Sequence, residues 1–314
     1  EKFFTRAQEE MPFNDPMLEQ QWHYDNQGLQ KIYKGAKKGE DINAFAAWKH
    51  TAGNNQVIVA VVDEGVKYDH PDLKDNMWVN PGEIAGNGRD DDGNGYVDDV
   101  YGLNAVKGTG NITWDRGGLV PDGKGGQVWD GDSGHGTHVA GTVAAVNNNG
   151  IGVAGVAGGS GNGDGVRIMS IQIFDGVDNT GLEQNARGIT YAADMGASVL
   201  QNSWGYPSDP ARMNDSVYEQ AYGVEYTALK YFQSKNNCPA MQGGVVIFAA
   251  GNEAKAGADY PGAYNEFLCV TAYGPDGLPT SYTNYNTGCN VAAPGGDFAY
   301  ANYDYKYDGC VLST

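Results

Sequence analysis

Three short motifs, far apart in the sequence, carry side chains that can act together on a carbonyl group. Asp63 ends an apolar run, His135 stands between two glycines, and Asn252 follows an apolar run in a Gly-Asn turn. A carboxylate can orient an imidazole, an imidazole can take up a proton, and an Asn amide can donate two hydrogen bonds. These residue types therefore suggest general-base chemistry with a donor for a developing negative charge.

Each motif taken alone also has a structural explanation. An Asp at a strand end often caps a turn, and Asn is one of the commonest turn residues. His138, three residues after His135, is interpreted as a packed or hydrogen-bonded structural histidine. Only the combination of the three motifs favours catalysis.

Apolar and helical segments alternate along the chain and indicate how these residues are positioned. Runs rich in β-branched residues predict buried parallel strands at 57–62, 167–171, 198–202, 245–249 and 268–272. Helices are predicted from His135 to Val146 and over 183–195 and 216–233. Strands alternating with helices predict an α/β fold built on a layered sheet. In such sheets the carboxyl edge of the strands carries the active site, which is where Asp63 would lie.

Five motifs in this order resemble the signatures of the subtilase family of serine peptidases. They are the Asp63 motif, His70-Pro71-Asp72-Leu73, the Gly-His-Gly-Thr-His-Val-Ala-Gly-Thr run around His135, Asn202-Ser203-Trp204-Gly205 and Ala249-Ala250-Gly251-Asn252-Glu253. The resemblance runs from about Asn14 to the end of the chain. It implies a three-layer subtilisin-like fold, with a mostly parallel central sheet and helices on both faces.

The resemblance also implies roles for individual residues. His135 would be the general base, Asp63 would orient it, and Asn252 would donate to the oxyanion. Residues of two further segments would hold the substrate backbone in an extended pose: Ser203, Trp204, Gly205, Ala250 and Gly251. Asp259 would lie at the floor of the pocket for the residue before the scissile bond. A carboxylate there would favour Lys or Arg.

One part of the family pattern is missing. The family nucleophile lies in Gly-Thr-Ser, and no Gly-Thr-Ser occurs in the 314 residues. Ser133, Ser203 and Ser313 are not expected to replace it. We expect either that the nucleophile lies beyond residue 314, so that the C-terminal part of the domain is missing here, or that the protein is a pseudo-peptidase or peptide-binding module.

An acidic loop predicts a calcium site. Residues 90–95 fit D-x-[DN]-x-[DN]-G, the first half of an EF-hand loop. The expected oxygen ligands are Asp90, Asp92, Asn94 and the Tyr96 carbonyl, with Asp98 or Asp99 adding charge. The alternative interpretation is an acidic turn without a metal.

A second calcium site follows from the family resemblance alone. Many subtilases hold Ca²⁺ between the N-terminal segment, the aspartate of the His-Pro-Asp-Leu motif and a loop after the histidine helix. Asp15, Asp72 and Asn149 would supply the side-chain oxygens here. Calcium would then clamp the N-terminal segment onto the domain.

Composition limits the class of protein. A formal net charge of −19 argues against nucleic acid as a partner. No apolar run approaches the roughly 20 residues of a membrane span, and no signal peptide is visible. With the family resemblance, this predicts a secreted or cell-surface endopeptidase that acts on protein or peptide substrates. Its own pro-segment or the missing C-terminal fragment are further expected partners.

Domain limits and cysteine pairing are less strongly indicated. Residues 1–12 are polar and predict a linker or pro-segment remnant, residues 13–314 predict the peptidase domain, and residues 104–131 predict a long surface loop. Four cysteines allow two disulfides in three pairings. Cys289 with Cys310 is the favoured pair, and buried free thiols are the alternative.

Overall fold

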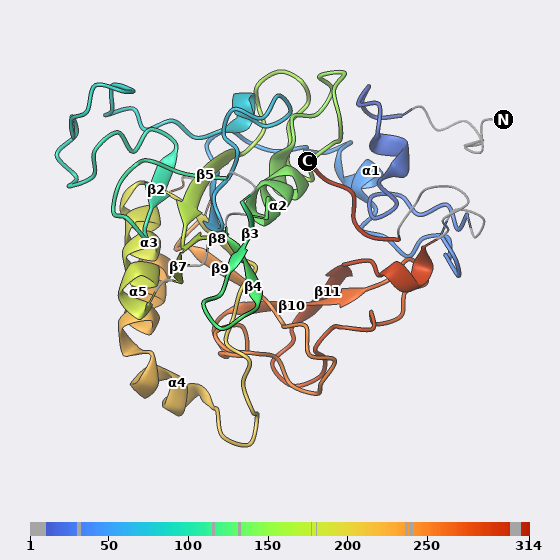
Figure 1. The fold of residues 1–314 in the computed structure, drawn as a ribbon. Coiled ribbons are helices and arrows are strands. Elements are labelled where there is room, and N and C mark those ends of the chain that lie inside the picture. The colour runs from blue at the N-terminus through green and yellow to red at the C-terminus, as the bar shows by residue number, and fades with distance from the viewer. Residues whose placement is uncertain are drawn as a thin grey trace.

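The computed structural model describes residues 11–29, 33–114, 117–130, 133–176, 178–179, 181–235, 238, 241–301 and 309–314. Its centre is a seven-stranded sheet with the strand order β11-β10-β9-β8-β1-β5-β2 (Figure 1). All six pairings within this sheet are parallel. The predicted parallel sheet is therefore confirmed.

Five of the seven strands coincide with the apolar runs of the sequence. These are β1 (Ile58–Asp63), β5 (Arg167–Gln172), β8 (Val199–Asn202), β9 (Val245–Ala249) and β10 (Leu268–Tyr273). The two outermost strands, β2 (Gly102–Asn104) and β11 (Val291–Pro294), were not expected. Both are short, and neither Gly-Leu-Asn nor Val-Ala-Ala-Pro has the composition of a strand.

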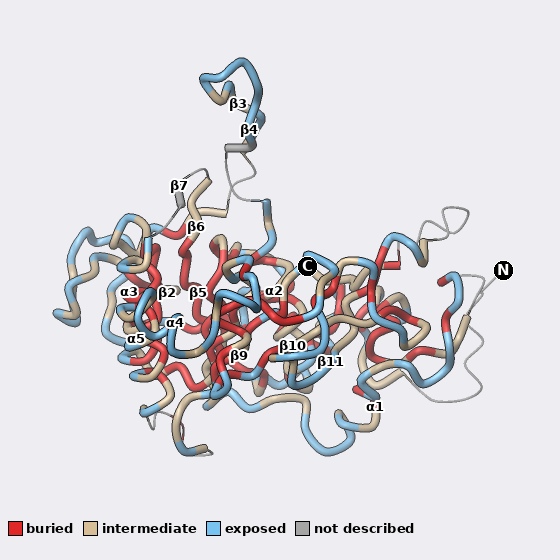
Figure 2. The backbone as a smooth tube through the Cα atoms, turned by 90° about the horizontal axis from the view of Figure 1, so that it is seen from below, coloured by how far each residue is buried: buried red, intermediate tan, exposed pale blue. Residues whose placement is uncertain are grey.

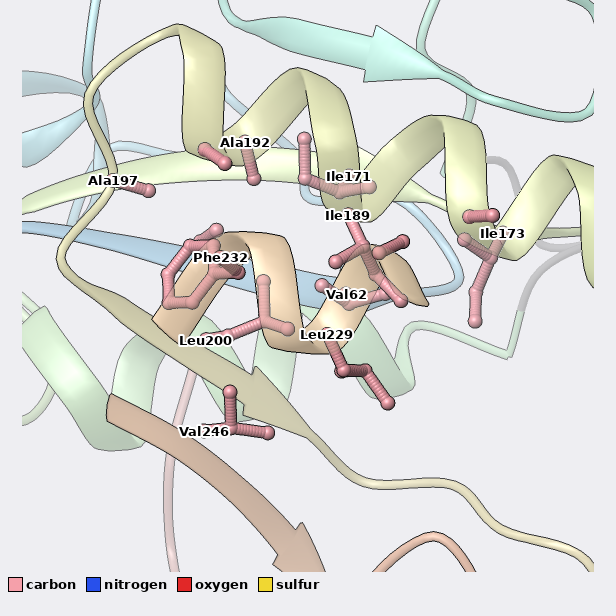
Figure 3. Close-up of a cluster of buried hydrophobic side chains, with 14 of the residues drawn as sticks. Val62, Ile171, Ile173, Ile189, Ala192, Ala197, Leu200, Leu229, Phe232 and Val246 are labelled. Atoms are coloured by element: carbon pink, nitrogen blue, oxygen red, sulfur yellow. The ribbon is translucent and has the colours of Figure 1, made fainter. Parts of the chain in front are cut away.

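Helices cover both faces of the sheet, as expected for three layers. On one face α3 (Leu182–Asp194) and α5 (Gly223–Ser234) pack on the largest cluster of buried apolar residues. Figure 3 shows Val62 and Leu200 of the strands pointing toward Ile189 of α3 and Leu229 of α5. On the other face α2 (His135–Ala144) packs through Ala140 and Ala144 on a second cluster.

The helix predicted over 216–233 is in fact two helices. α4 (Asp215–Ala221) is followed by Tyr222, whose φ of −117° lies outside the helical region. α5 then starts at Gly223. Glycine is a poor helix former, so the chain can change direction here at low cost. The apolar periodicity crosses the break because both helices contribute tyrosines to the same buried cluster.

The segment 104–131, predicted as a loop, contains a β-hairpin. β3 (Gly118–Pro121) pairs antiparallel with β4 (Gln127–Asp130). Figure 2 shows this hairpin projecting away from the body of the molecule. Its Gly-rich turn and weak apolar pattern hid the two strands.

The N-terminal segment packs beside the last described residues. Gln21 Nε2 donates to Ala154 O at 2.8 Å and to Leu312 O at 3.2 Å. Trp22 Nε1 donates to Cys310 O at 3.1 Å. Of the predicted linker, residues 1–10 lie outside the described residues, and the boundary at residue 13 stays a prediction. Among the described helices, none is long and apolar enough to cross a membrane.

The remaining elements are short. They are α1 (Ala44–Ala47), β6 (Phe174–Asp175), β7 (Asp178–Asn179) and the 3-10 turns η1 (Leu18–Gln20), η2 (Lys74–Asn76) and η3 (Phe298–Tyr300).

Candidate active site

Asp63 and His135 form a close pair at the carboxyl edge of the sheet. Asp63 is the last residue of β1, and His135 is the first residue of α2. Nδ1 of His135 lies 2.8 Å from Asp63 Oδ1 and 2.9 Å from Oδ2. A Cβ on Gly136 would lie only 2.6 Å from Gly65 O, so this glycine lets the start of α2 approach the Asp63 turn.

The burial of the two side chains differs in a way that suits proton transfer. Only 3% of the Asp63 side chain is exposed, against 49% for His135. Asp63 Oδ1 also accepts the backbone N–H of Glu64 at 2.7 Å. The hydrogen bond to Asp63 raises the pKa of His135, and burial opposes this rise. A carboxylate on Nδ1 places the ring proton there and leaves Nε2 as the basic atom.

His138 has the structural role that the sequence suggested. Its Nε2 lies 3.1 Å from Val311 O, and its own carbonyl accepts the hydroxyl of Ser313 at 2.7 Å. The ring thus ties α2 to the last described residues, and His138 also lines a cavity with His135 and Thr314.

Asn252 lies across the sheet edge from His135. A cavity of about 380 Å³ is lined by both residues and by Ser203, Ala250 and Gly251. Gly251 has φ +109°, and a Cβ there would lie within 2.7 Å of Asn284, Asp259 and Glu253. Only glycine fits this turn, which leaves Asn252 exposed at the rim of the cavity.

One of the two walls expected to hold substrate backbone is joined to the turn that follows Asp259. Tyr206 N, which follows Gly205, donates to Tyr260 O at 2.7 Å. A Cβ on Gly205 would lie 3.1 Å from the same carbonyl. Trp204 packs edge-on against Phe248, with ring centroids 5.1 Å apart, so its indole belongs to the core beneath the wall.

Asp259 already has a cationic partner within the chain. Only 3% of Asp259 is exposed, and its Oδ1 lies 2.7 Å from Lys255 Nζ. Oδ1 also accepts from Ser208 N at 2.8 Å, and Oδ2 accepts from Asn284 Nδ2 at 3.2 Å. The pKa of Asp259 is lowered: hydrogen bonds from its neighbours and the Lys255 charge outweigh the opposing effect of burial. The sequence analysis missed Lys255, although its i,i+4 spacing from Asp259 was a signal.

The three serines that were not expected to act as the nucleophile form hydrogen bonds outside the Asp63–His135 pair. Ser133 Oγ donates to Glu64 Oε2 at 2.7 Å, and Ser203 Oγ accepts from Gln201 Nε2 at 2.7 Å. Ser313 Oγ donates to His138 O, and the adjacent Thr314 Oγ1 donates to Thr137 O at 2.8 Å. The last two residues are therefore bound along α2, the helix that starts with His135.

The structure brings Asp15, Asp72 and Asn149 together. Asp15 accepts the backbone N–H groups of Asn148 and Asn149, and Asn149 Nδ2 donates to Asp72 Oδ1 at 2.8 Å. The exposed fractions of Asp15 and Asp72 are 4% and 1%. Burial, and to a lesser degree the Asp15 charge, raise the pKa of Asp72 to about 6. Two buried carboxylates without an ion-pair partner among the described residues fit a cation.

The acidic loop brings two of the predicted ligands together with one residue from outside the motif. Carboxylate oxygens of Glu83, Asp90 and Asp92 lie within 4.8 Å of one another. Asp98 does not join them, because its carboxylate accepts Asn87 N and Gly88 N in a neighbouring turn. Glu83 lies outside the motif, so the motif spacing could not reveal it.

Asn94 and Tyr96 are hydrogen-bonded to each other within the acidic loop. Asn94 Oδ1 accepts Tyr96 N at 2.8 Å, while Asp90 accepts the N–H groups of Gly93, Asn94 and Gly95. This wraps the loop around Asp90. Binding of an ion by Asn94 and the Tyr96 carbonyl stays a prediction.

None of the four cysteines, all of which lie among the described residues, forms a disulfide in the structure. The favoured pairing of Cys289 with Cys310 is not found. Cys310 instead pairs through its backbone with Gly296. Cys289 packs with the buried Cys269 in a small cluster.

The chain is similar to known proteins over most of its length. A family model described as "Subtilase family" matches residues 54–313. Halolysin of Haloferax mediterranei is 30% identical over 82% of this chain, and thermitase of Thermoactinomyces vulgaris is 29% identical over 84%. The matches cover 38% of halolysin and 71% of thermitase, and 27% of subtilisin-like protease 1 of Plasmodium falciparum. The chain thus spans well under half the length of several relatives.

Solved structures show the same fold. A protease from Pseudoalteromonas arctica superposes with a TM-score of 0.65 at 28% identity, over 96% of this chain and 77% of that one. The serine protease of Aeromonas sobria gives 0.66 at 22% identity, over 94% of this chain and 45% of that one.

Proposed function

Because this chain belongs to the subtilase family, we propose that the protein is a secreted serine endopeptidase whose Asp63, His135 and Asn252 act with a serine supplied after Thr314. The observation that carries the proposal is the hydrogen bond between Asp63 and His135 Nδ1, at the same sheet edge as Asn252. A buried carboxylate, a half-exposed imidazole and an exposed amide on one cavity match the requirements of acyl transfer.

Each of the three side chains would serve one step of peptide hydrolysis. His135 Nε2 takes the proton from the serine hydroxyl as the oxygen attacks the carbonyl, and later gives it to the leaving amine. Asp63 keeps the proton on Nδ1 and stabilises the imidazolium between these two transfers. Asn252 donates to the oxyanion, a contact worth about 3 kcal/mol of barrier.

Two contacts support the position of the nucleophile. The hydroxyls of Ser313 and Thr314 are hydrogen-bonded to carbonyls of the first turn of α2. Thr314 and His135 also line one cavity of about 720 Å³ (Figure 1 shows this end beside α2). These contacts support a nucleophile that follows Thr314 near the His135 end of the helix.

The segments that follow β8 and β9 suit an extended peptide. Ser203, Ala250 and Gly251 line the cavity with His135, and an extended substrate can form backbone hydrogen bonds there. Secretion is supported by a relative named as an extracellular basic protease of Dichelobacter nodosus, 29% identical over 90% of this chain.

Asp259 is proposed to act in substrate selection together with Lys255. The carboxylate of this partly buried ion pair lies beneath Gly251, where a Cβ would come within 2.4 Å of Asp259 Oδ2. Since Lys255 already balances one carboxylate, the preference for Lys or Arg that an unpaired Asp259 would produce is reduced.

Two calcium sites are proposed. Asp15, Asp72 and Asn149 would hold one ion, which stabilises the contact between the N-terminal segment and the loop after α2. Asp90, Asp92 and Glu83, with Asn94 and the Tyr96 carbonyl, would hold the other. Bound calcium here stabilises the loops and supplies no step of the reaction.

Labelling of the intact protein with a fluorophosphonate tests the proposal. A serine peptidase is expected to react, and His135→Ala should abolish labelling while leaving the fold intact. Labelling of neither protein, with tight binding of unmodified peptides, would instead identify a pseudo-peptidase. Mass spectrometry of the labelled peptide identifies the serine, and a label on Ser133, Ser203 or Ser313 would contradict the proposed position.

A further inference from the structure

Two cysteines lie together behind the turn that carries Asn252. Cys269 is in β10 and is fully buried, and it belongs to a cluster with Ala250 and Ala258. Cys289, in the turn before β11, is partly exposed and packs on that cluster. The two thiols thus meet on the side of the sheet that supports the candidate active site.

The backbone holds the two cysteines in this arrangement. Asn290 N, next to Cys289, donates to Cys269 O at 3.0 Å. In return Asn290 Oδ1 accepts Cys269 N at 2.7 Å. Val270 and Val291 follow as the first register pair of β10 and β11. Because these contacts bind the neighbours of both cysteines to each other, rotation of the two side chains is the main movement needed to join the sulfurs.

We infer that Cys269 and Cys289 form a disulfide when the protein meets an oxidising thiol–disulfide couple. The partly exposed Cys289 thiolate attacks the reagent disulfide, forming a mixed disulfide and releasing one reagent thiol. The sulfur of Cys269 then attacks Cys289 Sγ, loses its proton to solvent and releases the second reagent thiol. Two protein thiols are oxidised and one reagent disulfide is reduced to two thiols.

The order of the two attacks follows from burial. Burial raises the pKa of Cys269 to about 12, and its hydrogen-bonded neighbour Cys289 adds to the rise. Burial also raises the pKa of Cys289, but there the contact with Cys269 opposes the rise. Cys289 is therefore the better first nucleophile, and Cys269 the resolving thiol.

The disulfide would close a loop that supports the catalytic turn. Between the two cysteines lies Asn284, whose Nδ2 donates to Ala250 O at 3.1 Å and to Glu253 Oε2 at 2.7 Å. Its Oδ1 accepts Glu253 N at 3.1 Å. Linking Cys269 to Cys289 limits how far this loop can open and keeps Asn284 beneath Gly251 and Asn252.

Peptide mapping tests the inference without any need for activity. The intact protein is incubated with oxidised glutathione, alkylated in denaturant without reductant, and cleaved before aspartates. Cleavage before Asp259, Asp276 and Asp297 places Cys269 and Cys289 in separate peptides, and Cys238 and Cys310 in two others. We expect the peptides 259–275 and 276–296 to be joined, and to separate on reduction.

Stability gives a second readout. Reduction should lower the Tm of the oxidised protein by about 5–10 °C. The variant Cys289→Ala should lose this response, while the matched control Cys238→Ala should keep it. Alkylation of both Cys269 and Cys289 after oxidation, or a link from 276–296 to the peptide of Cys310, would overturn the inference.

Discussion

The carboxylate of Asp63 holds both of its oxygens within 2.9 Å of His135 Nδ1, although 72 residues separate the two in sequence. The pair joins the end of β1 to the start of α2. It fixes which ring nitrogen carries the proton, and the first two of the following expectations depend on it.

Replacing Asp63 with Asn should lower kcat of the intact protein by about 10⁴-fold. The amide can donate to Nδ1 and then stabilises the tautomer with the proton on Nε2, so His135 cannot accept the serine proton. Steady-state hydrolysis of a peptide substrate measures the loss. Asp69→Asn, which removes an exposed carboxylate near the site, is the control and should stay within twofold of the unmodified protein.

The pH profile should report the Asp63–His135 hydrogen bond. Since the bond raises the pKa of His135 and only neutral His135 is a base, kcat/KM should rise with pH through a pKa above 6.5. In Asp63→Asn the acid limb of the residual activity should move to lower pH. An acid limb at the same pH in both proteins would show that Asp63 does not set the His135 pKa.

Asn252→Ala should reduce kcat by about 10²–10³-fold with little change in KM. The lost donor acts mainly on the oxyanion, which exists only in the transition state and the intermediate. Because Asn252 is exposed, Tm should stay within about 1 °C. Asn162→Ala, in an exposed turn, serves as the matched control, and an equal loss in both variants would argue against the oxyanion role.

Calcium removal should lower Tm. Asp72→Asn should reduce the share of this Tm decrease that comes from the site formed by Asp15, Asp72 and Asn149. Binding to the folded state alone stabilises it by about 2.7 kcal/mol at a calcium concentration of 100 Kd. Scanning calorimetry with calcium and with a chelator measures the difference. Asp92→Asn tests the acidic loop separately, and an unchanged calcium response in the double variant would exclude both sites.

Lys255→Met should change the residue preferred before the scissile bond. The substitution leaves Asp259 without its cation, so a substrate Arg or Lys can replace Lys255 as its partner. The rate of cleavage after Arg relative to Leu should rise about tenfold or more, as expected for one hydrogen bond to a charged group. Lys230→Met, which breaks an exposed pair with Glu266, should leave the ratio unchanged.

Much of the catalytic arrangement could be predicted from the sequence. Asp63 follows a recognisable buried run, and parallel strands end at a common edge, so its place there followed from the strand pattern. The apolar runs also identified the five central strands, because burial on both faces leaves a continuous apolar signal. The two edge strands and the β3–β4 hairpin lack that signal and were missed.

Only the tertiary structure decided which side chains became partners. Lys255 neutralises Asp259, Glu83 joins Asp90 and Asp92 in the acidic loop, and Cys269 replaces Cys310 beside Cys289. Apolar periodicity and local motifs report the type and burial of an element. They carry no information on how turns from distant segments meet, since that depends on the path of the backbone between strands. The catalytic residue types were therefore readable in advance, and their neighbours became known only from the fold.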